Sequence, residues 1–156
     1  MSEQVQSIAA AFEPLLPQVS PEEIPMVIAI LERVAAAQYR TWAKDADNNV
    51  ERDGLLACAA REDEIASFIE SLESDSQARV AELHRRFPDF EARYEAVMAG
   101  RTRTDQLRIQ AEGELGGAGY MSQFSAATEG AVSARFESLA CCEEANSRFL
   151  SRLIGD

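Results

Sequence analysis

Four glutamates of this sequence are placed where they could bind metal ions. They are Glu32, Glu62, Glu114 and Glu143. Each lies in a segment of helical periodicity, and most of its neighbours three, four and seven positions away are apolar or small, which points its side chain inward. Carboxylates in an apolar interior repel one another and are poorly solvated, so they need a cation, protons or a basic partner. A carboxylate metal site is one arrangement that meets this need.

The sequence repeats itself around these glutamates. The four glutamates form two pairs along the chain, Glu32 with Glu62 and Glu114 with Glu143. The first glutamate of each pair has large apolar or aromatic side chains seven and ten positions later: Tyr39 and Trp42 after Glu32, and Met121 and Phe124 after Glu114. The second glutamate of each pair has a Phe six positions later. The two glutamates of a pair are 30 residues apart in the first half and 29 in the second. A duplicated helical hairpin explains this pattern.

In this pattern the sequence resembles the rubrerythrin and ferritin-like superfamily, over residues of about 21–73 and 104–153. In that family two helices each give a Glu and two others each give Glu-x-x-His, which together hold a pair of iron or manganese ions for oxygen or peroxide chemistry. The resemblance implies that Glu32 and Glu114 are the single-Glu ligands and that Glu62 and Glu143 open the Glu-x-x-His motifs. It also implies Fe or Mn ions as cofactors.

The chain departs from the family at both expected histidines. Three residues after Glu62 and Glu143 it has Ile65 and Asn146. An Ile side chain has no lone pair to donate, and a side-chain amide is a weak ligand for iron. Carboxylates alone suit a hard ion such as Mn²⁺, Mg²⁺ or Ca²⁺ better than a redox iron pair. We therefore expect a degenerate dinuclear site that is weakly metal-binding or metal-free.

Two other classes of function stay open. The chain could be a helical interaction or scaffold protein without metal chemistry, or an active non-haem di-iron or di-manganese oxidoreductase of the peroxidase or oxidase type. An ordinary up-and-down bundle, unrelated to ferritins, would place the four glutamates far apart. No Ser or Cys has a histidine at motif spacing, so the sequence assigns no catalytic residue.

The elements that must position the glutamates are predicted helices. An accessory segment over residues 3–14 ends before Pro14 and Pro17, because proline breaks a helix. Ser20-Pro21-Glu22-Glu23 is a helix-start signal, although Pro25 removes one early hydrogen bond and allows a kink or a delayed start. Four long helices are expected over about 21–44, 48–73, 104–127 and 131–153, with two shorter helical pieces over 75–99 that separate at Phe87-Pro88 and stop at Gly100.

Three glycines fall inside the third long helix, namely Gly116, Gly117 and Gly119. Each costs roughly 1 kcal/mol relative to Ala in a helix interior, so close packing, a π-bulge or a break is needed to explain them, and we favour close packing. Short turns within each helix pair and a long connection between the pairs predict an all-α fold. We expect a ferritin-like four-helix bundle with an accessory N-terminal helix and a helical crossover, as one domain over residues 1–156.

Composition limits the partners of the chain. The formal net charge is −12 and Lys and Arg do not cluster, which argues against binding nucleic acid or a membrane surface. The N-terminus lacks the features of a secretory signal and no stretch is long and apolar enough to span a membrane, so the expected location is cytoplasmic. We also expect a homo-oligomer, with a dimer as the simplest form.

The remaining metal-binding residue types are few. The three cysteines, Cys58, Cys141 and Cys142, lack the Cys-x-x-Cys spacing of a zinc site and are interpreted as small buried hydrophobes, with a vicinal redox pair as the alternative for the last two. The single histidine, His84, falls in the predicted crossover. We interpret it as a surface or packing residue and not as a ligand.

Overall fold

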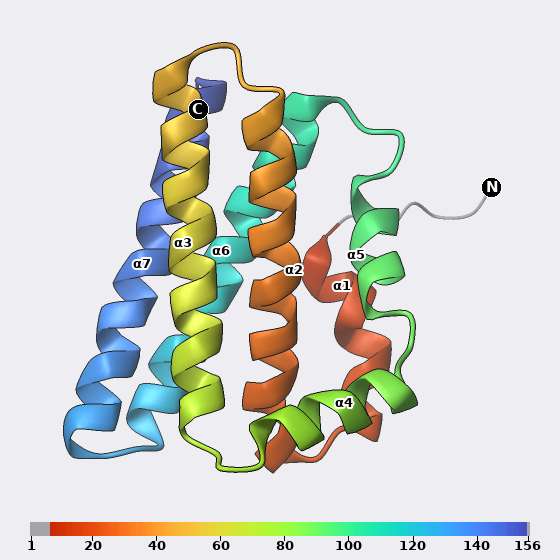
Figure 1. The fold of residues 1–156 in the computed structure, drawn as a ribbon, viewed down its shortest axis with the longest axis vertical. Helices are drawn as coiled ribbons and strands as arrows, with labels where there is room; N and C mark the ends of the chain where they lie inside the picture. Colours follow the sequence, from red (N-terminus) through yellow and green to blue (C-terminus); the bar gives the residue numbers. More distant parts are fainter. Residues whose placement is uncertain (1–6, 156) are drawn as a thin grey trace. The chain divides into compact units, whose positions relative to one another are not determined.

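Every regular element in the part of the chain that the structure describes is a helix. The computed structural model describes residues 7–155, and over this range it contains seven α-helices, two short 3-10 helices and no strand (Figure 1). Their bounds are α1 Ile8–Phe12, η1 Glu13–Gln18, η2 Pro21–Glu23, α2 Ile24–Lys44, α3 Asn49–Ser71, α4 Ser76–Arg86, α5 Phe90–Met98, α6 Arg103–Ala126 and α7 Gly130–Ile154. The predicted all-α class is confirmed.

The chain divides into two compact units. One runs from Ala11 to Ala96 and contains the antiparallel hairpin of α2 and α3 together with α4. The other comprises the described residues up to Ala10 and those from Val97 onward, and its main feature is the antiparallel hairpin of α6 and α7 (Figure 1). A single domain over residues 1–156 stays a prediction.

The N-terminal helical segment differs from the expectation. Helix α1 ends at Phe12, before both prolines, as predicted, but the chain then continues as the 3-10 helix η1, which contains Pro14 and Pro17. Pro14 lies in the first turn of η1, where a proline costs little because the missing N–H would have no partner there, whereas Pro17 lies inside this short helix. Residues 3–6 of the predicted segment lie outside the described residues.

The α2/α3 hairpin begins and turns at the predicted residues. Glu23 Oε2 accepts a hydrogen bond from the Ser20 backbone N–H at 2.9 Å, and the α-helix starts only at Ile24, which is the delayed start that Pro25 allows. At the turn, Asn48 Oδ1 accepts from the Glu51 backbone N–H at 2.9 Å and caps α3. The starts of α2 and α3 are therefore both fixed by side chains that the sequence identifies.

The predicted crossover pieces are confirmed as two helices. Helix α4 ends at Arg86 and α5 begins at Phe90, with Pro88 between them, and α5 ends at Met98, shortly before Gly100, whose φ is +73°. Aromatic rings pack these pieces inside their unit, because Phe90 stacks on Phe12 with 5.7 Å between ring centroids and meets Phe87 edge to face at 5.9 Å. The segment is thus ordered by an apolar cluster of its own.

The α6/α7 hairpin contains the glycine-rich stretch. Thr102 caps α6 by accepting a hydrogen bond from the Asp105 backbone N–H at 3.1 Å, and the turn into α7 uses Gly130 at a φ of +60°. Helix α6 runs through Gly116, Gly117 and Gly119 without a break or a π-helical turn. Two of the three explanations offered by the sequence are therefore wrong, and packing is the one that remains.

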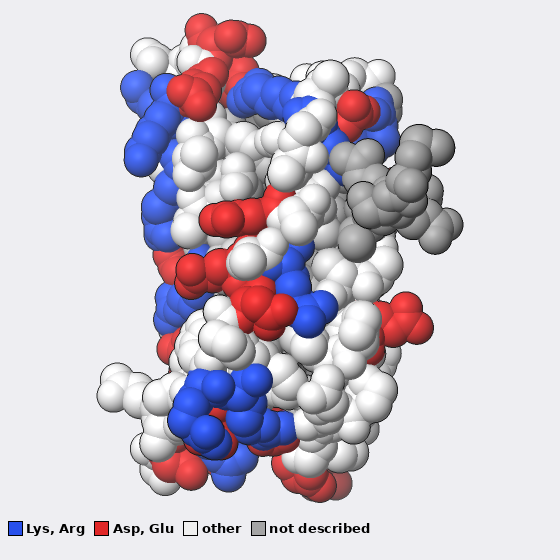
Figure 2. Space-filling model, turned by 90° about the vertical axis from the view of Figure 1, so that its right-hand side faces the viewer, with Lys and Arg blue, Asp and Glu red and all other residues white. Residues whose placement is uncertain are grey.

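Charged side chains are interspersed on the surface. On the face that Figure 2 draws, groups of Lys and Arg lie beside groups of Asp and Glu. None of the helices that the structure describes combines the length and the hydrophobicity needed to cross a membrane.

Candidate carboxylate site

The α2/α3 hairpin buries two glutamates close together. Glu32 on α2 is 7% exposed and Glu62 on α3 is 1% exposed. A carboxylate oxygen of Glu32 and one of Glu62 lie within 4.8 Å of each other. Both side chains point inward, as their apolar neighbours predict, and two negative charges at this separation in a dry interior repel each other strongly.

The residues around this pair are mainly apolar. Ile65, three residues after Glu62, is fully buried and offers no lone pair. Tyr39 is also fully buried and packs edge to face against Trp42, with 5.6 Å between ring centroids. A ligand set in this hairpin would therefore be built from carboxylate oxygens, which hard divalent cations prefer.

Arg33, the neighbour of Glu32 in sequence, is engaged elsewhere. Its guanidinium donates to Asp63 Oδ1 at 2.7 Å, to Glu70 Oε2 at 3.0 Å and to Ser67 Oγ at 2.9 Å, all on α3. Arg40 forms a second ion pair with Asp63. This ionic clamp, consisting of Arg33, Arg40, Asp63 and Glu70, joins α2 to α3 on the outer side of the hairpin.

The ionic clamp shifts the pKa values of its members. Burial alone would raise the pKa of Asp63, but hydrogen bonds from Arg40 and Arg33 outweigh burial and hold that pKa below its ordinary value. The hydrogen bond to Glu70 raises the pKa of Arg33 further above its already high value. Both groups therefore stay charged at neutral pH.

In the α6/α7 hairpin, the first glutamate is hydrogen-bonded to side-chain amides. Glu114 on α6 is 2% exposed, and both of its oxygens accept hydrogen bonds from side-chain amides. Gln110 Nε2 donates to Oε1 at 2.6 Å, and Asn146 Nδ2, from α7, donates to Oε2 at 3.3 Å. Asn146, three residues after Glu143, thus donates to a carboxylate.

The second glutamate of this hairpin occupies space left by a glycine. Glu143 on α7 is 1% exposed. A Cβ atom added to Gly117 on α6 would lie 2.8 Å from Glu143 Cδ, closer than real Cβ contacts allow. A Cβ added to Gly116 or Gly119 would meet nothing within 4 Å. The close approach expected of the glycine stretch is therefore a helix-to-carboxylate contact, and only at Gly117.

Sequence reasoning missed two members of this hairpin's polar interior. Gln110 is 3% exposed, and the available signal was its position four residues before Glu114 on the same helical face. Ser147 is buried and donates to the Ala111 carbonyl oxygen at 2.9 Å. Its signal was a small polar side chain next to the inward-facing Asn146.

The histidine and the cysteines, the other residue types that bind metals, have other contacts or positions than these glutamates. His84 on α4 is exposed and meets Phe90 edge to face at 5.9 Å between ring centroids. The prediction of buried cysteines is confirmed for Cys58 and wrong for Cys141, which is exposed, while Cys142 is half-buried. Each residue of an α-helix is turned by about 100° from the last, so Cys141, two positions before the inward Glu143, lies on the opposite side.

Each helix of the two hairpins thus supplies one of the four predicted glutamates, buried in the interior, and α3 buries a further glutamate, Glu51, near its start. The structure brings Glu32 and Glu62 together, and it places Glu114 and Glu143 in the interior of the α6/α7 hairpin. The carboxylate donors fit a hard divalent cation, and the Glu143 carboxylate lies where a side chain at Gly117 would begin. The gathering of all four glutamates into one dinuclear centre stays a prediction.

Comparison of the chain with protein-family models, with curated proteins and with solved structures finds no match. The likeness to ferritins therefore rests on the glutamate pattern alone.

Proposed function

We propose that this chain is a ferritin-like helical protein whose buried glutamates form a degenerate metal site that binds a divalent cation weakly. The observation that carries the proposal is the Glu32–Glu62 pair, in which two buried carboxylate oxygens lie within 4.8 Å of each other. A cation between such oxygens would remove the repulsion and replace the lost hydration of both charges.

The donor set determines the kind of ion. With Ile65 and Asn146 in the two histidine positions, the ligands are oxygen atoms, which favour Mn²⁺, Mg²⁺ or Ca²⁺ over the softer metals. The missing nitrogen donors also weaken the case for iron. Binding is therefore expected to be weak, and an ion held in this way would stabilise the fold.

Mn²⁺ titration of the full chain tests the proposal. We expect saturable Mn²⁺ binding, followed by calorimetry and by the electron paramagnetic resonance signal of the free ion, and we expect Glu62→Gln to weaken it at least tenfold. Glu64→Gln is the matched control because Glu64 lies on the same helix and is exposed. Saturable binding that is equal in Glu62→Gln and the wild type, or no binding at all, would refute the proposal.

A metal-free helical scaffold is the second candidate, and one observation favours it. Both oxygens of Glu114 accept hydrogen bonds from amides, which stabilises a buried carboxylate without any cation. On this alternative, Glu32→Gln and Glu62→Gln would each raise the free energy of unfolding in the presence of chelator, and the wild type would contain no metal. Stoichiometric iron together with peroxide turnover would instead favour an active oxidoreductase.

Two further expectations from the sequence stay predictions. Self-association, with a dimer as the simplest form, is tested by light scattering after gel filtration. A cytoplasmic location is tested by fractionation of the source cells.

A further inference from the structure

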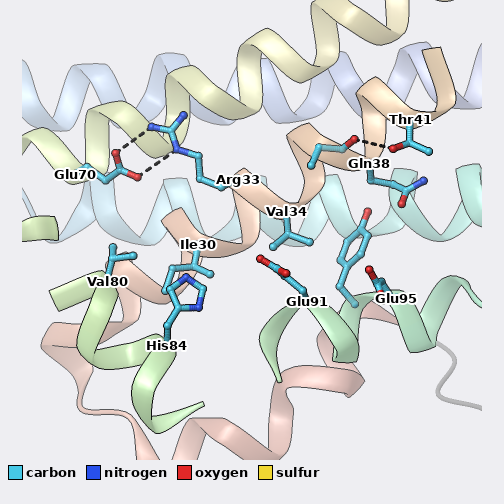
Figure 3. A pocket seen from close by; sticks show the side chains of 12 residues that line it. Ile30, Arg33, Val34, Gln38, Thr41, Glu70, Val80, His84, Glu91 and Glu95 are labelled. Carbon is cyan, nitrogen blue, oxygen red and sulfur yellow. Dashed lines mark hydrogen bonds and ion pairs between the residues drawn. The ribbon is translucent and has the colours of Figure 1, made fainter. Parts of the chain in front are cut away.

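A pocket separate from the buried glutamates lies within the unit of residues Ala11–Ala96. Its volume is about 360 Å³, at the small end of the range of roughly 300–1,000 Å³ that ligand pockets occupy. Helices α2, α4 and α5 form most of its wall, and α3 contributes Glu70 (Figure 3). The site is concave and built from several elements of one unit.

The inner part of the pocket is aliphatic. Ile30 and Val34 come from α2, where Ile30 is buried and Val34 half-buried, and Val80 comes from α4. Ala37, one turn after Val34, adds a small exposed side chain. Figure 3 shows Ile30 and Val34 facing the side chains of α4 and α5 across the pocket. Such a wall favours a short hydrocarbon chain, since apolar contact removes both surfaces from water.

The charges of the pocket are unevenly balanced. Its lining contains three carboxylates, of Glu70, Glu91 and Glu95, and one guanidinium, of Arg33. Arg33 is already bound to Glu70 through two hydrogen bonds and to Asp63. Glu91 and Glu95, both exposed on α5 and one helical turn apart, form no ion pair with any described basic side chain. The outer part of the pocket therefore carries a net negative charge with hydrogen-bond acceptors available.

We propose that this pocket binds a small primary alkylamine. The ammonium group would lie between the carboxylates of Glu91 and Glu95, and the hydrocarbon chain would contact Val34, Ile30 and Val80. An anionic ligand is disfavoured by the two carboxylates and by the net charge of the whole chain, −12. A neutral ligand of the same length would gain the apolar contacts but lose the charge-assisted hydrogen bonds.

A series of ligands of equal length tests the proposal with the full chain. Hexylamine, 1-hexanol and hexanoate are each titrated into ¹⁵N-labelled protein while backbone amide shifts are followed by NMR. We expect saturable shifts with hexylamine that centre on Val34, Val80 and Glu91, with weaker binding of hexanol and none of hexanoate. Hexylamine binding that is absent, or that maps away from these residues, would overturn the proposal, as would hexanol binding equally well.

Substitutions in the pocket test separately whether binding needs its carboxylates and its free volume. Glu91→Gln with Glu95→Gln should weaken hexylamine binding about tenfold, because each exposed charge contact contributes a fraction of that factor. Glu112→Gln with Glu129→Gln removes the same charge from exposed positions outside the pocket and should change binding less than twofold. Ala37→Leu fills the pocket while keeping both carboxylates and should abolish binding. Equal weakening in the two glutamine pairs would mean that only the net charge attracts the amine, and the site would be rejected.

Discussion

The α2/α3 hairpin and the α6/α7 hairpin each bury two of the four predicted glutamates, one on each helix, yet they surround these charges by different means. In α2/α3, Glu32 and Glu62 lie near each other, and the residue three positions after Glu62 is the aliphatic Ile65. In α6/α7, the corresponding residue is Asn146, which donates to Glu114 from the facing helix. Two positions thus distinguish the hairpins, because Gln110 and Asn146 donate to Glu114 where α2 and α3 have the aliphatic Ile28 and Ile65.

The difference extends to the packing of the second glutamate. Gly117 leaves the room that the Glu143 carboxylate fills, at the cost of a glycine in the middle of α6. Helix α2 contains no glycine, and its small residues near Glu32 are Ala35 and Ala36. A buried carboxylate can therefore be accommodated by amide donors and by a missing side chain, and such an arrangement does not by itself require a metal ion.

The largest effect is expected from removing the amide that distinguishes the hairpins. Asn146→Leu leaves a carboxylate oxygen of buried Glu114 without its donor from α7, and it should lower the free energy of unfolding by about 3 kcal/mol. Ile65→Leu at the matching position of α3 breaks no hydrogen bond and should cost less than about 1.5 kcal/mol. Urea unfolding measures both. If Asn146→Leu is as stable as the wild type, the amide does not support Glu114.

A smaller effect separates the three glycines of α6. Gly117→Ala places a methyl group against Glu143 and should cost about 1–3 kcal/mol, as overpacking of an interior does. Gly116→Ala and Gly119→Ala meet nothing within 4 Å and should each stabilise the protein by roughly 0.5–1 kcal/mol, through helix propensity. Thermal and urea unfolding of the three variants shows directly whether each substitution raises or lowers the free energy of unfolding. Stabilisation by Gly117→Ala would show that the carboxylate moves aside freely.

Much of the fold could be predicted because its signals are local. The Asn48 cap, the break at Pro88 and the helix stop beside Gly100 each depend on the chemistry of one or two residues, and each lies where the sequence places it. The continuation of the chain as η1 was missed, since Pro14 is tolerated in the first turn of this helix and Pro17 lies inside it, whereas both prolines are predicted from the sequence to break a helix.

The candidate site could be predicted only in part. Periodicity correctly places all four glutamates in the interior, because burial of a helical face follows from its neighbours at three, four and seven positions. The partners of each glutamate could not be obtained in that way. The hydrogen bond from Asn146 to Glu114 joins residues 32 positions apart, and the contact of Gly117 with Glu143 also crosses between two helices. Such pairings depend on helix register, which no local pattern encodes.

The smallest effect concerns the ionic clamp on the outside of α2/α3. Asp63→Asn removes a carboxylate that binds Arg33 and Arg40, and because these side chains are partly exposed the cost at pH 7 should be only about 0.5–1 kcal/mol. The folded-state pKa of Asp63 is depressed, so its contribution is present above the unfolded pKa of about 3.9 and is lost as the pH falls through the folded-state value. Urea unfolding at pH 7, 5 and 2.5 should therefore show the free energies of unfolding of the wild type and Asp63→Asn converging at the lowest pH.

The control is Asp53→Asn, which changes an exposed aspartate on the same helix and should leave the free energy of unfolding close to that of the wild type at every pH. A difference between the wild type and Asp63→Asn that persists at pH 2.5 would assign the effect to packing and not to the charge, and the two hairpins would then differ only in their interiors.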